Sequence, residues 1–174
     1  MGVILYGMKI LVFTEGTITV HPQAKGLCRE EIVQQSLNRN TNDVEIEDYK
    51  NYILLGNPRQ KLASWKKQGA DILYLTSRTK PKEIDLVRET LKKYELLDYE
   101  NLFFRENNEN YAEVAERLMP DILIEDDCES IGGKPEMTYT NIKKELKPKI
   151  KQIVVKEFQG INHLPDNLRE LQNY

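Results

Sequence analysis

Three acidic residues stand side by side at the end of an apolar run, and their chemistry indicates a metal site. Glu125, Asp126 and Asp127 directly follow the run 121–124. Adjacent carboxylates repel one another unless a positive charge lies close to them. A hard cation such as Mg²⁺, which oxygen ligands hold, would supply that charge. We therefore expect metal ligands here; a solvated turn with helix-capping aspartates is the alternative.

Two further apolar runs end in groups that can bind anions. Thr76, Ser77 and Arg78 follow the run 71–75, and Arg105 follows another such run. Hydroxyl groups and guanidinium groups hold phosphate and other oxyanions. The hydroxyls could also cap the helix that follows, and the two roles are compatible. We expect these four residues to contact a bound phosphate group.

A single carboxylate follows the first apolar run, 9–13. Glu15 lies there, and Gly16 and Thr17 after it permit a tight turn away from the sheet. One glutamate alone indicates no particular chemistry. Together with the other two run ends, it completes a set of acids and anion-binding groups.

The elements that must position these residues are short and apolar. Continuous apolar runs are typical of parallel strands covered on both faces. Five such runs occur, at 9–13, 71–75, 102–104, 121–124 and 153–155, and helical patterns begin near Pro58, Pro81, Tyr111 and Pro165. This alternation predicts an α/β protein with a parallel sheet and right-handed crossovers. Ligands in such sheets bind outside the carboxyl ends of the strands, where the candidate residues lie.

The segment from about 18 to 55 interrupts this alternation. It contains one expected helix, around Ile32, Val33 and Leu37, followed by a polar stretch at 38–43. Insertions at such a position often act as lids over a site. A surface excursion without a role is the alternative. We expect one domain over residues 1–174, with this insertion as a small cap or lid.

Charge and composition exclude several classes of protein. The 174 residues carry 25 basic and 28 acidic side chains, a net charge of −3, which makes a nucleic-acid partner unlikely. No apolar stretch is long enough to span a bilayer, and the opening residues lack the basic region of a signal peptide. Cys28 and Cys128 are expected to be reduced thiols, so we expect a cytoplasmic protein. Met8 is a second possible start.

The three run ends together resemble the motifs of the haloacid dehalogenase-like (HAD-like) superfamily, whose typical members are Mg²⁺-dependent aspartyl phosphatases. The family's first motif is an apolar strand followed by Asp-x-Asp-Gly-Thr, its second an apolar strand ending in Thr or Ser, and its fourth an apolar strand ending in paired acids. The similar segments, in the same order, are Ile10-Leu11-Val12-Phe13-Thr14-Glu15-Gly16-Thr17-Ile18, Ile72-Leu73-Tyr74-Leu75-Thr76 and Ile122-Leu123-Ile124-Glu125-Asp126-Asp127.

The resemblance spans about residues 8 to 172 and carries expectations for the fold. It implies a three-layer, Rossmann-like parallel sheet with the first strand in the middle. The second and third strands would lie on one side of it, and the fourth and fifth on the other. A short cap insertion would follow the first motif, and Mg²⁺ would be the cofactor.

The departures from the family pattern bear on the chemistry. Phe13 occupies the position of the nucleophilic Asp, and a phenyl ring can neither attack phosphorus nor bind Mg²⁺. Glu15 stands at the position of the general acid/base, one methylene longer than Asp. No lysine lies between Lys93 and Lys134 to serve as the third-motif lysine, and Arg105 could replace it. Lys80 and Lys82 are further candidates.

The fourth motif can be aligned in two ways. Matching the paired acids selects Asp126 and Asp127, whereas matching the residues after them selects Glu125 and Asp126. Asp126 is common to both alignments. It is therefore the best metal candidate.

Two functions from different classes remain open. The first is a phosphatase-like hydrolase, or a former enzyme, in which water oriented by Glu15 is the direct nucleophile. The second is a non-catalytic protein that binds a phosphorylated small molecule or a partner. Phe13 favours the second, while Thr76 and the acids favour a site that still binds a ligand. The sequence predicts a HAD-like protein with a phosphate- and Mg²⁺-binding type of site and without conventional aspartyl-phosphatase turnover.

Overall fold

The central sheet contains five parallel strands in the expected order. The computed structural model describes residues 7–38 and 46–174. The strands are β1 (Met8–Phe13), β4 (Ala70–Leu75), β5 (Leu102–Phe103), β6 (Ile122–Asp126) and β7 (Lys151–Val155), arranged in the order β5-β4-β1-β6-β7. The predicted parallel α/β sheet, with the first strand in the middle, is confirmed.

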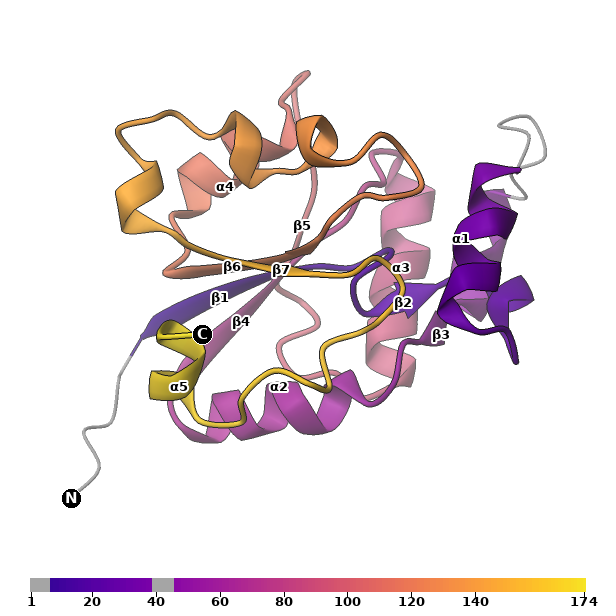
Figure 1. Ribbon diagram of the computed structural model, residues 1–174, viewed down its shortest axis with the longest axis horizontal. Helices are drawn as coiled ribbons and strands as arrows, with labels where there is room; N and C mark the ends of the chain where they lie inside the picture. Colours follow the sequence, from indigo (N-terminus) through magenta and orange to yellow (C-terminus); the bar gives the residue numbers. More distant parts are fainter. Residues whose placement is uncertain (1–6, 39–45) are drawn as a thin grey trace.

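Helices cover both faces of the sheet, which gives three layers (Figure 1). One face carries α2 (Pro58–Lys67), α3 (Pro81–Lys93) and α5 (Leu168–Gln172). The other carries α4 (Tyr111–Leu118) and the short 3-10 turns η3 (Lys134–Glu136), η4 (Tyr139–Asn141) and η5 (Lys147–Lys149). Each strand is therefore covered on both sides, as its continuous apolar sequence requires.

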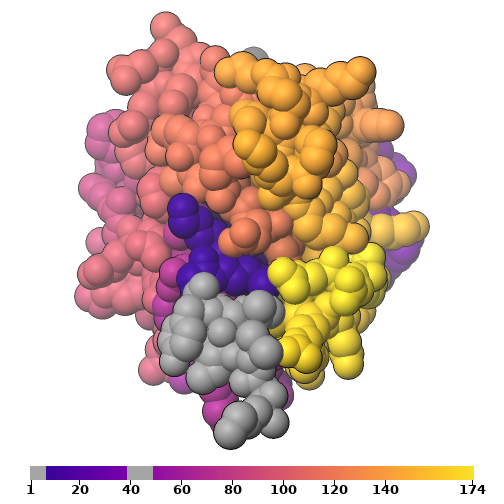
Figure 2. Space-filling model, turned by 90° about the vertical axis from the view of Figure 1, so that its left-hand side faces the viewer, coloured from indigo at the N-terminus to yellow at the C-terminus, as the bar shows by residue number. Residues whose placement is uncertain are grey.

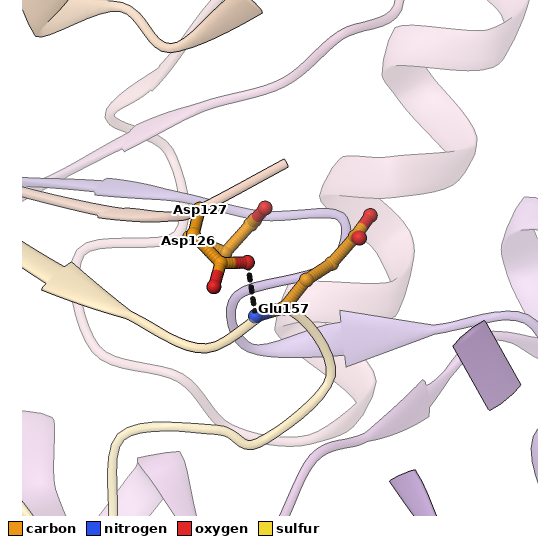
Figure 3. A group of neighbouring side chains, drawn as sticks. All are labelled: Asp126, Asp127 and Glu157. Carbon is orange, nitrogen blue, oxygen red and sulfur yellow. Dashed lines mark hydrogen bonds between the residues drawn. The ribbon is translucent and has the colours of Figure 1, made fainter. Parts of the chain in front are cut away.

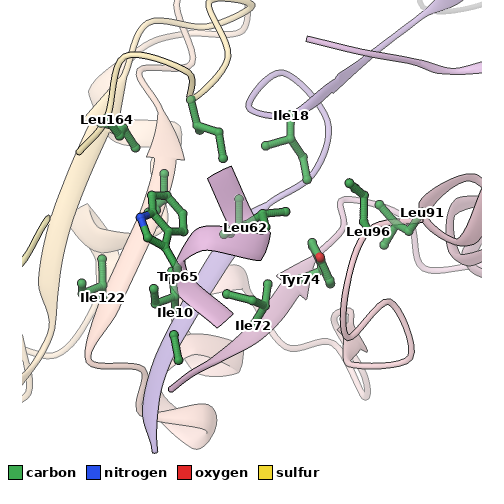
Figure 4. Packing of buried hydrophobic residues seen from close by; sticks show 14 of the residues in the cluster. Ile10, Ile18, Leu62, Trp65, Ile72, Tyr74, Leu91, Leu96, Ile122 and Leu164 are labelled. Atoms are coloured by element: carbon green, nitrogen blue, oxygen red, sulfur yellow. The ribbon is translucent and has the colours of Figure 1, made fainter. Parts of the chain in front are cut away.

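Alternation along the strands divides the core into two clusters. Ile10 and Ile122 face the side of α2, whereas Leu11 and Leu123 face the side of α4. Figure 4 shows the first cluster around Trp65 of α2. The Trp65 side chain is fully buried, and its Nε1 donates to the carbonyl of Pro165 (2.9 Å), so the ring also holds the C-terminal segment.

Two helices begin where the sequence predicts, and side chains cap their first turns. Asn57 precedes Pro58, the first residue of α2, and its Oδ1 accepts from the backbone N of Gln60 (3.3 Å). Asn110 and Glu113 form the predicted capping box of α4, in which each side chain accepts from the other's backbone N (2.9 and 2.8 Å). These bonds satisfy N–H groups that the first turn of a helix leaves free.

Several element bounds differ from the sequence prediction: β6 includes Glu125 and Asp126, which were expected to follow it, and β7 begins two residues early, at Lys151. Strand β5 ends at Phe103, and the carbonyl of the next residue, Phe104, accepts from Arg117 Nη2 (3.2 Å). The last helix begins only at Leu168, where the Asn167 side chain caps it.

The segment inserted after β1 is closed by a small antiparallel pair of strands. It contains β2 (Thr19–Val20), η1 (Pro22–Ala24), α1 (Arg29–Leu37), η2 (Ile46–Asn51) and β3 (Ile53–Leu54). Strand β2 pairs with β3, so the insertion leaves and rejoins the core at neighbouring points. The expected helix around Ile32 is α1. The polar stretch from residue 39 to 43 and the opening residues 1–6 lie outside the described residues.

The two ends of the sheet differ in what surrounds them. Figure 2 views the end where the strands begin, and the C-terminal segment lies there in yellow. The inserted segment lies at the opposite end, on the right of Figure 1.

Across residues 7–38 and 46–174, no helix has the length and apolarity that crossing a membrane requires.

Two Val→Ala substitutions test the importance of the buried sheet. Val12, in the central strand, has no exposed surface, whereas Val154, in the edge strand β7, is 44% exposed. We expect Val12→Ala to lower the free energy of unfolding by about 2–3 kcal/mol, because it leaves a cavity. Val154→Ala should lower it by less than about 1 kcal/mol. Chemical denaturation of both variants measures the difference, and equal losses would contradict the packing described here.

Candidate functional site

Glu15 lies just beyond the end of β1, and its carboxylate accepts three hydrogen bonds from the chain. Oε2 accepts hydrogen bonds from Thr14 Oγ1 (2.6 Å) and from the backbone N of Ser77 (3.1 Å), and Oε1 accepts from Thr76 Oγ1. The β1 and β4 ends supply these donors. The structure therefore brings Glu15 and Thr76 into direct contact.

The residues expected to bind phosphate also have partners within the chain. Thr76 is buried and bonded to Glu15. The Arg78 guanidinium donates from Nε to Ser77 Oγ (2.9 Å) and from Nη1 to the Tyr49 hydroxyl, with its Cζ 4.9 Å from the Tyr49 ring centroid. An oxyanion at these groups would compete with Glu15 and Tyr49 for the same donors.

Arg105 packs over an aromatic ring. Its Cζ stands 4.5 Å from the centroid of the Tyr111 ring, and Nη2 donates weakly to the carbonyl of Ser77 (3.4 Å). It lines a neighbouring cavity of about 220 Å³, and its buried Nε has no hydrogen-bond partner. Lys80, one of the two lysines also considered as a source of positive charge, is exposed and pairs with Glu83 (3.6 Å).

An aromatic pair closes the carboxyl end of β1. Phe13 and Tyr111 meet edge to face, with ring centroids 5.2 Å apart and planes at 78°. This geometry is favourable for aromatic pairs. Residue 13, which the motif resemblance aligns with a nucleophilic Asp, is thus a packed ring that offers no nucleophile.

Asp126 is the last residue of β6 and faces the turn after β1. Its Oδ2 accepts from Thr17 Oγ1 (2.8 Å), and its Oδ1 from the backbone N of Cys128 (2.9 Å). Gly16, at φ +84°, passes so close that a Cβ there would lie 2.9 Å from Asp126 Oδ2. The chain can make this turn against the carboxylate because residue 16 has no side chain.

Glu125 lies on the other face of the same strand. Its carboxylate accepts from the backbone N of Thr138 (2.6 Å) and of Tyr139 (3.0 Å) and from Gln152 Nε2 (3.0 Å). Successive side chains of a strand point to opposite faces. Strand β6 runs through Asp126, so the two side chains leave the strand on opposite faces, although both line the cavity at the strand ends.

Three acids from two adjacent strand ends form a compact group (Figure 3). Asp126, Asp127 and Glu157 each place a carboxylate oxygen within 4.8 Å of the others. Asp127 Oδ1 accepts from the backbone N of Glu157 (3.1 Å), while the Glu157 carboxylate accepts from Ser130 N (2.6 Å) and Oγ (2.7 Å). Sequence analysis missed Glu157, although it follows the fifth apolar run as the other candidates follow theirs.

The acidic group fits a hard divalent cation by its donor set. All three ligands would be carboxylate oxygens, which Mg²⁺ prefers. Burial raises the pKa of Asp126 and of Glu157, and the neighbouring carboxylates add to the rise. The charged forms are thus destabilised in the protein alone, and a cation would offset this cost.

A cavity of about 310 Å³ opens beside these groups. Phe13, Glu15, Arg78, Asp126 and Glu157 line it from the sheet edge. The insertion contributes most of another wall, which includes Val20, His21, Ile32, Gln35 and Tyr52. The inserted segment therefore forms part of the candidate site, and much of the surface that it offers is apolar or aromatic.

Comparison with known proteins supports the fold and little else. No protein-family model and no curated protein matches the chain. Among solved structures, the chain is similar to the Class C acid phosphatase from Bacillus anthracis with tungstate bound (TM-score 0.51, 13% identity, 89% of this chain and 68% of that chain). It is also similar to a chain of the Pnkp1/Rnl/Hen1 RNA repair complex (TM-score 0.52, 16% identity), covering 89% of this chain and 44% of that one. At such low identity the likeness concerns the fold, and it supports the HAD-like fold that the motifs imply.

Two Gly→Ala substitutions test the close approach of the chain to Asp126. Gly16 and Gly26 have nearly the same φ, +84° and +83°, but only Gly16 has atoms within 4 Å of the Cβ position. Both variants should lose about 1–2 kcal/mol from the left-handed backbone alone. Gly16→Ala should lose at least about 1 kcal/mol more, because Asp126 must move. Equal losses in chemical denaturation would show that this contact is loose.

Proposed function

We propose that this protein binds a divalent cation, Mg²⁺, together with a phosphorylated small molecule in the cavity at the carboxyl edge of the sheet. We further propose that it does not hydrolyse phosphate esters through an aspartyl-phosphate. One observation carries the proposal: Phe13 packs edge to face on Tyr111, and the motif resemblance aligns this residue with the carboxylate that the route needs.

The covalent route needs a carboxylate at position 13 for two purposes. A carboxylate there would attack phosphorus and would also bind the cation that neutralises the transferring group. Phe13 does neither, and its ring lines the cavity. Loss of a covalent nucleophile can lower the rate by a factor on the order of 10⁶. Binding without covalent turnover is the function that we propose.

Asp126, Asp127 and Glu157 would hold the cation. When bound, Mg²⁺ would supply a positive charge to which an anionic ligand group is attracted. The chain itself orients the acids, since Thr17 and Ser130 hold Asp126 and Glu157 by hydrogen bonds. The ligand's anionic end would thus face the β6 and β7 ends.

The wall formed by the insertion suits the rest of such a ligand. Val20, Ile32 and Tyr52 line the cavity there, and Phe158 lies on the same side, packed against Val20 and Ile32. Binding sites are commonly apolar with a few polar groups that fix orientation. We infer that the insertion covers the apolar or aromatic part of the ligand, as a lid over a binding site does.

The cysteines support a reducing compartment such as the cytoplasm and play no part in the proposed chemistry. Cys28 and Cys128 are both free. Burial raises the pKa of Cys128, and the nearby Asp126 and Glu125 raise it further. The Cys128 thiol therefore stays protonated, which makes it a poor nucleophile.

Mg²⁺ should stabilise the wild-type protein against heat. A ligand at a hundred times its Kd adds about 2.7 kcal/mol to the free energy of unfolding when it binds only the folded state. Asp126→Asn and Glu157→Gln should each abolish the rise in Tm. Glu136→Gln, which removes a charge from the same cavity outside the acidic group, should preserve it. A rise in Tm that survives Glu157→Gln would place the cation elsewhere.

The wild-type protein should show neither turnover of a generic phosphate ester with Mg²⁺ nor a phosphoryl group trapped on the chain. Phe13 leaves no carboxylate to accept that group. The assay should include Phe13→Asp with Glu15→Asp, which restores the carboxylate pair, and Asp126→Asn as a control. Trapped phosphate on the wild type would overturn the proposal. Turnover without trapping, abolished by Glu15→Gln, would instead support hydrolysis by water that Glu15 activates.

A further inference from the structure

The carboxylate of Glu15 is surrounded by buried hydrogen-bond donors from two neighbouring strand ends. Thr14 Oγ1 and the backbone N of Ser77 donate to one oxygen (2.6 and 3.1 Å), and Thr76 Oγ1 donates to the other. Thr14 and Thr76 have no exposed surface. We call these three groups the donor cradle.

A positive charge lies next to the donor cradle. Burial alone would lower the pKa of Arg78, but the negative charge of Glu15, the largest opposing influence, helps to raise it. The guanidinium is fixed by Ser77 Oγ and the Tyr49 hydroxyl, so its position does not depend on Glu15 alone. The cradle would remain electropositive if the Glu15 side chain left it.

Two hydroxyls, one backbone N–H and a nearby guanidinium are the groups that bind a tetrahedral oxyanion such as phosphate. In this protein a carboxylate of the chain already occupies them. We propose that Glu15 is an internal anion that fills an oxyanion-binding cradle at the β1 and β4 ends and keeps external oxyanions out of it.

The exclusion follows from charge and from hydrogen-bond capacity. A phosphate group entering beside Glu15 would meet a like charge and would find the Thr14, Thr76 and Ser77 donors taken. It can bind in the cradle only when the Glu15 side chain swings into the cavity that it lines. This step needs no cation, so the inference is independent of the acidic group at Asp126.

Phosphate binding to Glu15→Ala, measured by calorimetry in EDTA, tests the inference. The wild type should show little binding of inorganic phosphate. Glu15→Ala should bind it at least about tenfold more tightly, because charge-assisted hydrogen bonds become available. Adding Thr76→Val to Glu15→Ala should remove the gain. Because EDTA removes divalent cations, failure of the proposed Mg²⁺ site would not affect this result.

Glu136→Ala is the matched control, since it removes one negative charge from the same cavity outside the cradle. An equal gain in Glu136→Ala would show a general charge effect and overturn the inference. So would a folded Glu15→Ala without gain, or wild-type phosphate binding that Thr76→Val abolishes. If Glu15→Ala does not fold, Glu15→Gln replaces it, because it keeps the side-chain shape without the charge. A smaller gain is then expected, and no gain overturns the inference.

Discussion

The burial of carboxylates where parallel strands end is the constraint on which this site depends. The sheet brings Glu15, Asp126 and Glu157 to one edge from three different strands. Each charge must be compensated there by hydrogen-bond donors or by a cation. Glu15 has a complete set of donors, whereas burial still raises the pKa of Asp126 and Glu157 despite their hydrogen bonds. The charge of Glu15 is thus compensated by donors of the chain, whereas the group around Asp126 and Glu157 is suited to a cation.

The twofold periodicity of β6 decides which acids can act together. Glu125 points to the face of α4 and is bonded by Thr138 and Gln152, so it stabilises the turns that cover that face. Asp126 points to the opposite face, toward Thr17. The two alignments of the fourth motif therefore select different sets of acids. The alignment that pairs Asp126 with Asp127 selects two acids of the compact group, and Glu157 is the third.

The fold could be predicted from the sequence because its signals are local. Apolar runs, the Asn110 cap and strand alternation each depend on a few neighbouring residues. The partners of Glu15 and Arg105 depend on side-chain direction across different strands, which no local pattern encodes. The two-residue strands of the insertion are too short to show periodicity. Glu157 follows the apolar run of β7 just as the other candidates follow theirs, so the same pattern of an acid after an apolar run predicts it.

The aromatic pair at the β1 end places no charge at that point of the sheet edge. Phe13 and Arg105 both pack on the ring of Tyr111, Phe13 edge to face and the Arg105 guanidinium over the ring. The acids that remain grouped come from the β6 and β7 ends alone. A cation held by them needs no ligand from residue 13. On the proposed function, cation binding at Asp126, Asp127 and Glu157 would therefore be separable from covalent chemistry at residue 13.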